Sequence, residues 1–70
     1  MTKYQAQIRT KNRGEEWVSI NAGTNYNLLD TLQEAKDVIA KAREYNDKFP
    51  TFTYEYRIAE IDFTVHYINQ

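Results

Sequence analysis

The spacing of apolar residues changes twice along this chain, and no other sequence feature constrains the fold as strongly. Apolar residues alternate with polar ones in 4–10 and 16–20, recur at helical spacing over 32–45, and alternate again in 52–58. Alternation is typical of strands with one buried face, and a spacing of three to four is typical of an amphipathic helix. The sequence therefore predicts the order strand, strand, helix, strand.

The first two strands are joined by residues 12–14, which end in Gly14. A three-residue hairpin loop favours glycine at its third position, where φ is positive. With this loop, Ile8 lies opposite Val18 on one face, as a core requires. Arg9 then lies opposite Trp17 on the other face, where the guanidinium can stack on the indole ring.

The helix has a defined start and end. Residues 31–34, Thr-Leu-Gln-Glu, match a capping box, and Pro50 prevents a helix from continuing past residues 46–49. One side of this helix is apolar and should face the core: Leu32, Ala35, Val38, Ile39, Ala42 and Tyr45.

A right-handed crossover through the helix places the third strand beside the first. We therefore expect an α+β fold of the ββαβ type, with a three-stranded antiparallel sheet in the order 2-1-3. The helix covers one face of the sheet, and the other face stays open. Residues 1–70 form a single domain with its core in 4–61.

The tail after the third strand has a different phase. Its apolar residues occupy odd positions, whereas the strand uses even ones: Ile61, Phe63, Val65 and Tyr67. The change predicts a bulge or bend at Ala59-Glu60, and no turn signal stands there. Residues 62–70 are then a fourth strand or a strand extension. An exposed apolar stripe favours the hypothesis that the segment runs on and pairs with a second copy, giving a dimer.

The residue inventory argues against catalysis. The chain has no cysteine and one histidine, which excludes disulfides, thiolate zinc sites and multi-histidine metal sites. His66 has no nucleophile to activate, and Glu60 and Asp62 most simply protect a sheet edge by their charge. We expect no enzyme activity, no cofactor and no metal.

The open face is the best candidate for a binding surface. Net charge is −1, but residues 1–13 hold four basic residues and no acid. Basic residues around one tryptophan resemble both a protein-binding hot spot and a single-stranded nucleic-acid platform. The candidate partner-binding residues are Arg9, Lys11, Arg13, Trp17 and Arg57.

The sequence also bears on location. No apolar run approaches the roughly 20 residues of a membrane span, and residues 1–5 lack the apolar core of a signal peptide. A cytoplasmic protein with no membrane partner is therefore expected.

Three segments carry a resemblance to a group of proteins. They are Trp17-Val18-Ser19-Ile20, Leu32-x-x-Ala35-x-x-x-Ile39 and Tyr54-x-Tyr56-Arg57-Ile58. This layout resembles small bacteriophage proteins of the ββαβ type, which include inhibitors of host RNA polymerase and anti-CRISPR proteins. The resemblance covers residues 4–61 and implies a non-enzymatic inhibitor of a host protein complex in the host cytoplasm. A nucleic-acid-binding module is the alternative.

Overall fold

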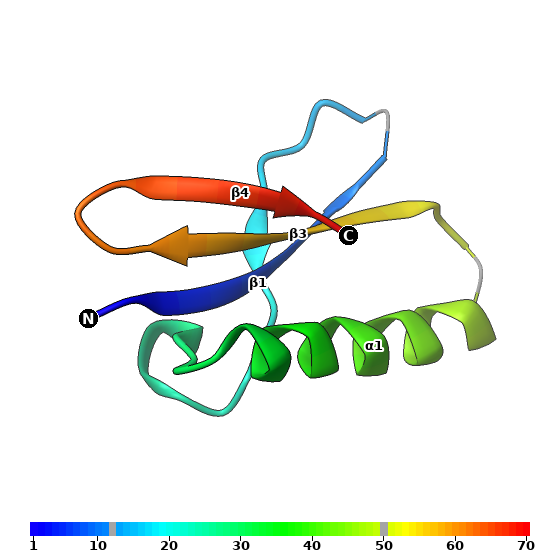
Figure 1. Cartoon of the computed structure of the whole chain (residues 1–70). Helices are drawn as coiled ribbons and strands as arrows, with labels where there is room; N and C mark the ends of the chain where they lie inside the picture. The colour runs from blue at the N-terminus through cyan, green and yellow to red at the C-terminus, as the bar shows by residue number, and fades with distance from the viewer. Residues whose placement is uncertain (12, 50) are drawn as a thin grey trace.

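A computed structural model describes residues 1–11, 13–49 and 51–70. Its elements in chain order are β1 (Lys3–Thr10), β2 (Val18–Ser19), the 3-10 turn η1 (Asn25–Asn27), α1 (Leu32–Lys48), β3 (Tyr54–Ile61) and β4 (Val65–Asn69). The strands form one antiparallel sheet in the order β2-β1-β3-β4 (Figure 1). The α+β fold and the order 2-1-3 are confirmed, and a fourth strand completes the sheet.

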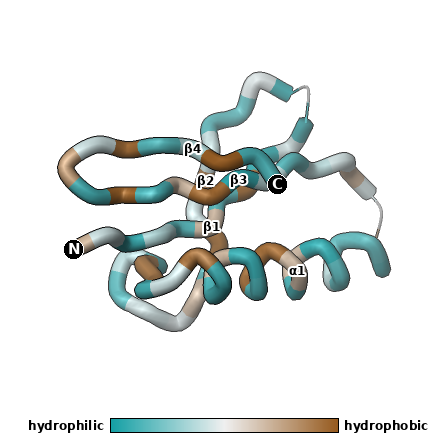
Figure 2. The backbone as a smooth tube through the Cα atoms, viewed as in Figure 1, coloured by the Kyte–Doolittle hydropathy of each residue, from teal (hydrophilic) through white to brown (hydrophobic). Residues whose placement is uncertain are grey.

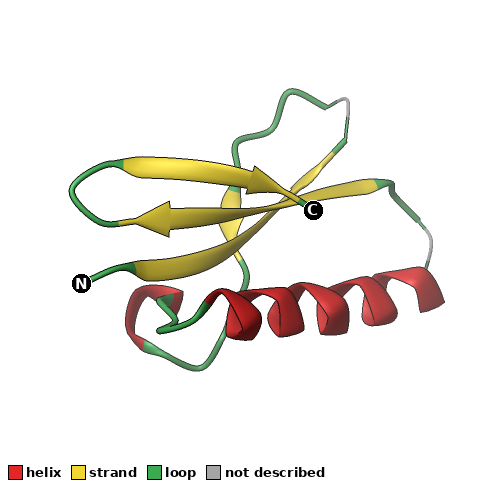
Figure 3. Ribbon diagram, in the orientation of Figure 1, coloured by secondary structure: helices red, strands yellow, loops and turns green. Residues whose placement is uncertain are grey.

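The hydrophobic core lies between the sheet and α1, which covers one face (Figure 3). Ile39 of α1 and Ile58 of β3 are its largest fully buried side chains. The remaining core residues come from β1, β3, α1 and the loop before the helix: Ala6, Leu29, Ala35 and Tyr56. The even positions of β1 and β3 therefore face the helix, as the alternation predicts.

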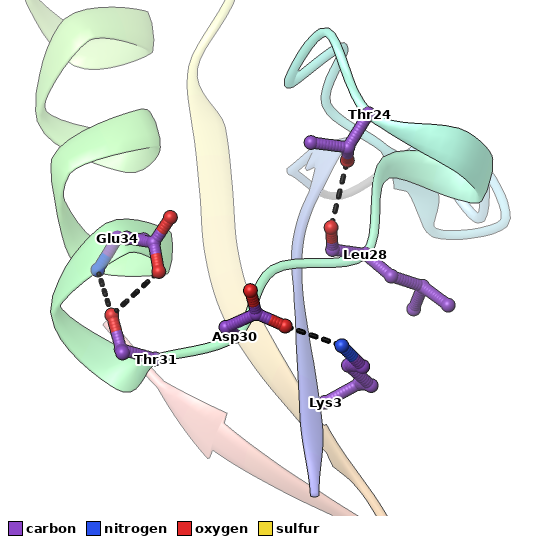
Figure 4. Close-up of polar contacts among 6 residues, drawn as sticks. All are labelled: Lys3, Thr24, Leu28, Asp30, Thr31 and Glu34. Atoms are coloured by element: carbon purple, nitrogen blue, oxygen red, sulfur yellow. Dashed lines mark hydrogen bonds and ion pairs between the residues drawn. The ribbon is translucent and has the colours of Figure 1, made fainter.

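The helix start is fixed by side chains (Figure 4). The backbone N–H of Glu34 donates to the Thr31 hydroxyl oxygen at 3.1 Å, which confirms the predicted cap. Lys3 forms an ion pair with Asp30, one residue before the cap, and this contact ties the helix start to β1. In the preceding loop, the Thr24 hydroxyl donates to the Leu28 carbonyl at 2.7 Å. The helix ends at Lys48, within the predicted range, and Pro50 lies outside the described residues.

The apolar side of the helix differs from the expectation at one residue. Tyr45 is 66% exposed and packs against Phe49, with ring centroids 5.4 Å apart. It therefore lies outside the core that Ala35 and Ile39 help to form. Helical spacing alone could not show that the core ends before this turn.

The first hairpin has the predicted register but a shorter second strand. Ile8 pairs with Val18, and Gly14 has φ +65°. Asn12, the first residue of the predicted loop, lies outside the described residues. The strand expected over 16–20 is reduced to β2, and the N–H of Lys11 bonds to the Thr53 carbonyl at 2.8 Å. At the end of β1 next to the hairpin loop, the backbone is therefore hydrogen-bonded to the segment before β3.

The predicted bulge at Ala59-Glu60 is wrong. β1 and β3 pair without interruption, and the chain reverses only after β3, at residues 62–64. There the N–H of Thr64 donates to the Asp62 carboxylate at 2.9 Å, and the N–H of Asp62 to the Thr64 carbonyl at 3.0 Å. An aspartate that bonds the backbone two residues on is a common turn signal. The tail thus pairs with β3 of the same chain rather than running on to a second copy.

The change of apolar phase has a different cause. Odd positions of β3 lie on the open face, and Ala59 is nevertheless only 1% exposed. Its cross-strand partner on β4 is Tyr67, and Ile61 is paired with Val65. Figure 2 shows hydrophobic residues on β4 as well as on α1. By this pairing Ala59, Ile61, Val65 and Tyr67 share the face opposite the helix, whereas Phe63 is fully exposed at the turn.

Candidate functional site

Four side chains on the open face form a stack that runs across the sheet, here called the aromatic–arginine ladder. The Arg57 guanidinium carbon lies 4.3 Å from the centre of the Trp17 ring and 3.7 Å from that of Tyr67. The corresponding distance from Arg9 to Trp17 is 4.6 Å. The predicted stacking of Arg9 on Trp17 is confirmed, and Arg57 is held between two aromatic rings.

The strand register brings these residues together. Gln7 pairs with Ser19 on one side and with Arg57 on the other, and Arg57 pairs with Asn69. Directly paired residues project to the same face, and so do residues two apart along a strand. Trp17 and Tyr67, each two residues before a member of this row, therefore reach Arg57 from opposite sides.

A chain of hydrogen bonds through glutamine side chains of β1 holds the Arg57 guanidinium in place. Arg57 Nε donates to Gln7 Oε1 at 2.6 Å, and Gln7 Nε2 donates to Gln5 Oε1 at 2.8 Å. Gln5 Nε2 in turn donates to the carbonyl of Tyr26 at 2.8 Å. A planar guanidinium that is both stacked and hydrogen-bonded loses little further freedom when a partner binds, so the ladder is preorganised.

The basic residues predicted for this face fall into two groups, those in the ladder and those at the hairpin loop. Arg9 and Arg57 are in the ladder, and Arg9 also forms an ion pair with Glu55. Arg13 lies instead in the hairpin loop, 3.3 Å from Glu15 and with its guanidinium carbon 5.3 Å from the Phe52 ring centre. Lys11 is exposed at the base of the same loop. The structure thus brings together Arg9, Trp17 and Arg57, and separates Arg13 from them.

Tyr67 is the ladder residue that the sequence does not predict for this site. It is predicted with Ile61, Phe63 and Val65 as part of a dimer or edge stripe, and in the structure its ring also packs on Arg57. The signal that could have placed it is Asp62-x-Thr64, which indicates a turn and hence a hairpin. Beside the ladder, Ile61 and Val65 form the apolar part of the open face, with fully exposed Phe63 at the hairpin turn.

The candidate acid–base residues do not form a catalytic set. His66 is exposed, and its Nε2 lies 2.9 Å from the Thr64 hydroxyl oxygen. The backbone N–H of Thr64 holds the pKa of the Asp62 carboxyl below its ordinary value, with smaller contributions from the Thr64 hydroxyl and His66. In the part of the chain that the structure describes, no three acidic or histidine side chains gather as a metal site would require.

The edge-protection interpretation of Glu60 and Asp62 is wrong. β3 lies inside the sheet, where Glu60 is paired with His66 of β4, and Asp62 belongs to the turn. These two acids therefore protect no edge. Their proximity in sequence reflects the end of a strand followed by a turn.

A groove of about 480 Å³ opens between α1 and the β2 side of the sheet. Its walls are mainly apolar: Ile8, Ile20, Ala22, Val38, Ala42 and Tyr45, with Asn21, Lys41 and Asn46 as polar members. Lys41 is the one ionisable group among them apart from the Tyr45 phenol. The groove therefore offers shape and apolar surface rather than acid–base chemistry.

No known protein family, curated protein or solved structure matches this chain. Within residues 1–11, 13–49 and 51–70, no helix combines the length and apolar character needed to cross a membrane.

Proposed function

We propose that this protein is a non-enzymatic binding protein that attaches to a partner protein through its open sheet face. The observation that carries the proposal is the aromatic–arginine ladder. It places one tryptophan, one tyrosine and two arginines in a continuous stack on the face opposite α1. Tryptophan, tyrosine and arginine are the residues most enriched among energetic hot spots of protein interfaces.

The charge pattern supports a protein partner over a nucleic acid. Arg9 is paired with Glu55, and Arg57 is sandwiched between rings that a nucleobase would need for stacking. Nucleic-acid platforms combine accessible aromatic faces with cations available to phosphates. A nucleic-acid-binding module remains the second candidate because Tyr67 adds a second aromatic ring to this face.

The layout of strands and helix that resembles phage inhibitors of the ββαβ type supports a more specific form of the proposal. In that form the protein acts in the cytoplasm of a host cell, and it blocks a host protein complex by occupying a site on it. The preorganised ladder suits this role, since a rigid surface loses little conformational entropy on binding.

The test compares Trp17→Ala with the wild-type protein in pull-downs from bacterial lysate, followed by affinity measurement on the captured protein. Loss of a hot-spot residue should weaken binding at least about 30-fold, or about 2 kcal/mol. Tyr45→Ala is the matched control, because Tyr45 is also an exposed aromatic residue but lies on α1.

Two results would overturn the proposal. One is capture that Trp17→Ala leaves unchanged and Tyr45→Ala abolishes. The other is tight binding of single-stranded oligonucleotides that falls steeply between about 50 mM and about 200 mM salt, which would indicate the nucleic-acid module instead.

A further inference from the structure

The outer edge of β4 is a regular strand edge that no other strand of residues 1–11, 13–49 and 51–70 pairs with. β4 is the last strand of the sheet order, and its five residues, Val65–Asn69, contain no Lys, Arg, Asp, Glu or Pro. Natural proteins usually protect such edges with charges, prolines or bulges. A regular edge without these protecting residues is a surface on which another strand can pair.

The hydrogen-bond pattern shows which backbone groups point outward. Bonds from Gln70 N–H to the Tyr56 carbonyl, and from Asp62 N–H to the Thr64 carbonyl, place even-numbered residues in the bonded pairs with β3. In an antiparallel ladder the alternate residues bond on the other side. The N–H and C=O groups of residues 65, 67 and 69 therefore point away from the sheet.

We propose that β4 pairs with β4 of a second copy of this chain about a two-fold axis at Tyr67, which joins two sheets into one of eight strands. This register aligns β4 with itself along its full length. Tyr67 then faces Tyr67 of the second copy, and the outward groups of residues 65 and 69 bond each other. The interface is isologous and closes, so it ends at a dimer.

Three observations favour a second copy of the chain. Val65–Asn69 contain no Lys, Arg, Asp or Glu that would repel its counterpart across the axis. Val65 and Tyr67 are each about half exposed, so pairing would cover apolar surface. The contact with Arg57 draws the Tyr67 ring toward the sheet centre, which leaves the outer backbone accessible.

The opposite edge does not offer the same surface. β2 has two residues, follows the exposed acids Glu15 and Glu16, and is joined to the adjacent loop by a hydrogen bond from Asn27 to Ser19 at 2.9 Å. A short, irregular and charged edge is poorly suited to pairing. The proposal therefore assigns the dimer contact to β4 alone.

Sedimentation of the full chain between about 10 µM and about 1 mM tests the proposal, because an interface of one short strand belongs to the weak class. The mass should rise toward that of two chains. Tyr67→Pro should abolish this rise, since proline removes the outward N–H at the axis. Tyr67→Ala also lacks the ring but keeps the N–H, and should weaken the dimer by less than about tenfold. Ser19→Pro, the corresponding change at the β2 edge, should leave it unchanged.

Amide exchange on the wild-type chain gives a readout that needs no variant. The amides of residues 66 and 68 should be protected at every concentration, and those of 65, 67 and 69 only at high concentration. A monomer throughout the range, or a dimer lost in Ser19→Pro and kept in Tyr67→Pro, would overturn the proposal. Partner binding through Trp17 is measured separately, so either proposal can fail without the other.

Discussion

The eight residues of β3 alternate between two faces of the sheet, and the two faces differ in their contacts. Toward α1, Tyr56 and Ile58 are buried in an apolar core, whereas on the other face Arg57 lies between two aromatic rings and hydrogen-bonds Gln7. The buried face gains its stability from the removal of apolar surface from water. The open face gains its stability from cation–π contacts and hydrogen bonds, which depend on the orientation of the side chains and leave polar groups near solvent. One strand can therefore hold the fold together on one face and carry the ladder on the other.

The largest effect should come from the helix-facing side. Ile58 is fully buried, so Ile58→Ala should lower the free energy of unfolding by about 2–5 kcal/mol, through lost transfer energy and a cavity. A chain of this length has roughly 4–10 kcal/mol in total, at about 0.05–0.15 kcal/mol per residue. Urea denaturation measures the change.

Ile61→Ala is the matched control for that prediction, because Ile61 lies on the same strand but on the open face and is only half-buried. Ile61→Ala should lower the free energy of unfolding by less than half as much as Ile58→Ala. Equal costs would mean that the two faces contribute equally to stability and would remove the contrast between them.

Replacing Arg57 by lysine should have an intermediate effect. Lysine keeps the positive charge but cannot stack as a plane between Trp17 and Tyr67 while bonding Gln7. The loss of two cation–π contacts, each worth about 0.5–1 kcal/mol, should lower stability by about 1–2 kcal/mol. The tryptophan fluorescence maximum should shift to longer wavelength as Trp17 becomes more exposed.

Arg43→Lys serves as the comparison, since Arg43 is exposed on α1 and its guanidinium carbon lies 4.8 Å from the centre of the Tyr56 ring. It should cost less than Arg57→Lys and leave the fluorescence unchanged. If both variants behave alike, the ladder has no special role in holding the open face.

The smallest effect concerns the turn that joins β3 and β4, the strands that carry Arg57 and Tyr67 of the ladder. Because the Thr64 N–H lowers the pKa of Asp62 in the folded chain, the ionised carboxylate stabilises the turn. This contribution is complete above the unfolded pKa of about 3.9 and is lost as the pH falls through the lowered folded value. The NMR signal of the Thr64 amide should shift through that titration, and Asp62→Asn should remove the shift. A Thr64 signal that does not move with pH would contradict the turn geometry.

Local patterns in the sequence determined most of the fold. Alternation identified the helix-facing residues of β1 and β3, the Thr31 cap marked the start of the helix, and Gly14 predicted the first turn and the pairing of Ile8 with Val18. These features succeed because side-chain direction and turn geometry depend on neighbours a few residues apart. The same register also predicted Arg9 beside Trp17, and so half of the ladder.

Only the tertiary structure decided the fate of the tail. The change from even to odd apolar positions reports which side of a strand is apolar, but it does not say whether the chain has bulged or has begun to cover the opposite face. The pairing of β4 with β3 distinguishes these two possibilities. The register fixes which residues of β4 lie opposite which residues of β3, and paired residues point to the same face of the sheet. Tyr67 then meets Arg57, ten residues earlier in the chain, and Trp17, fifty residues earlier, lies on the other side of the same guanidinium. Asp62-x-Thr64 indicates the turn into β4, but the meeting of Trp17, Arg57 and Tyr67 also depends on the order of all four strands, which no local spacing in the sequence encodes.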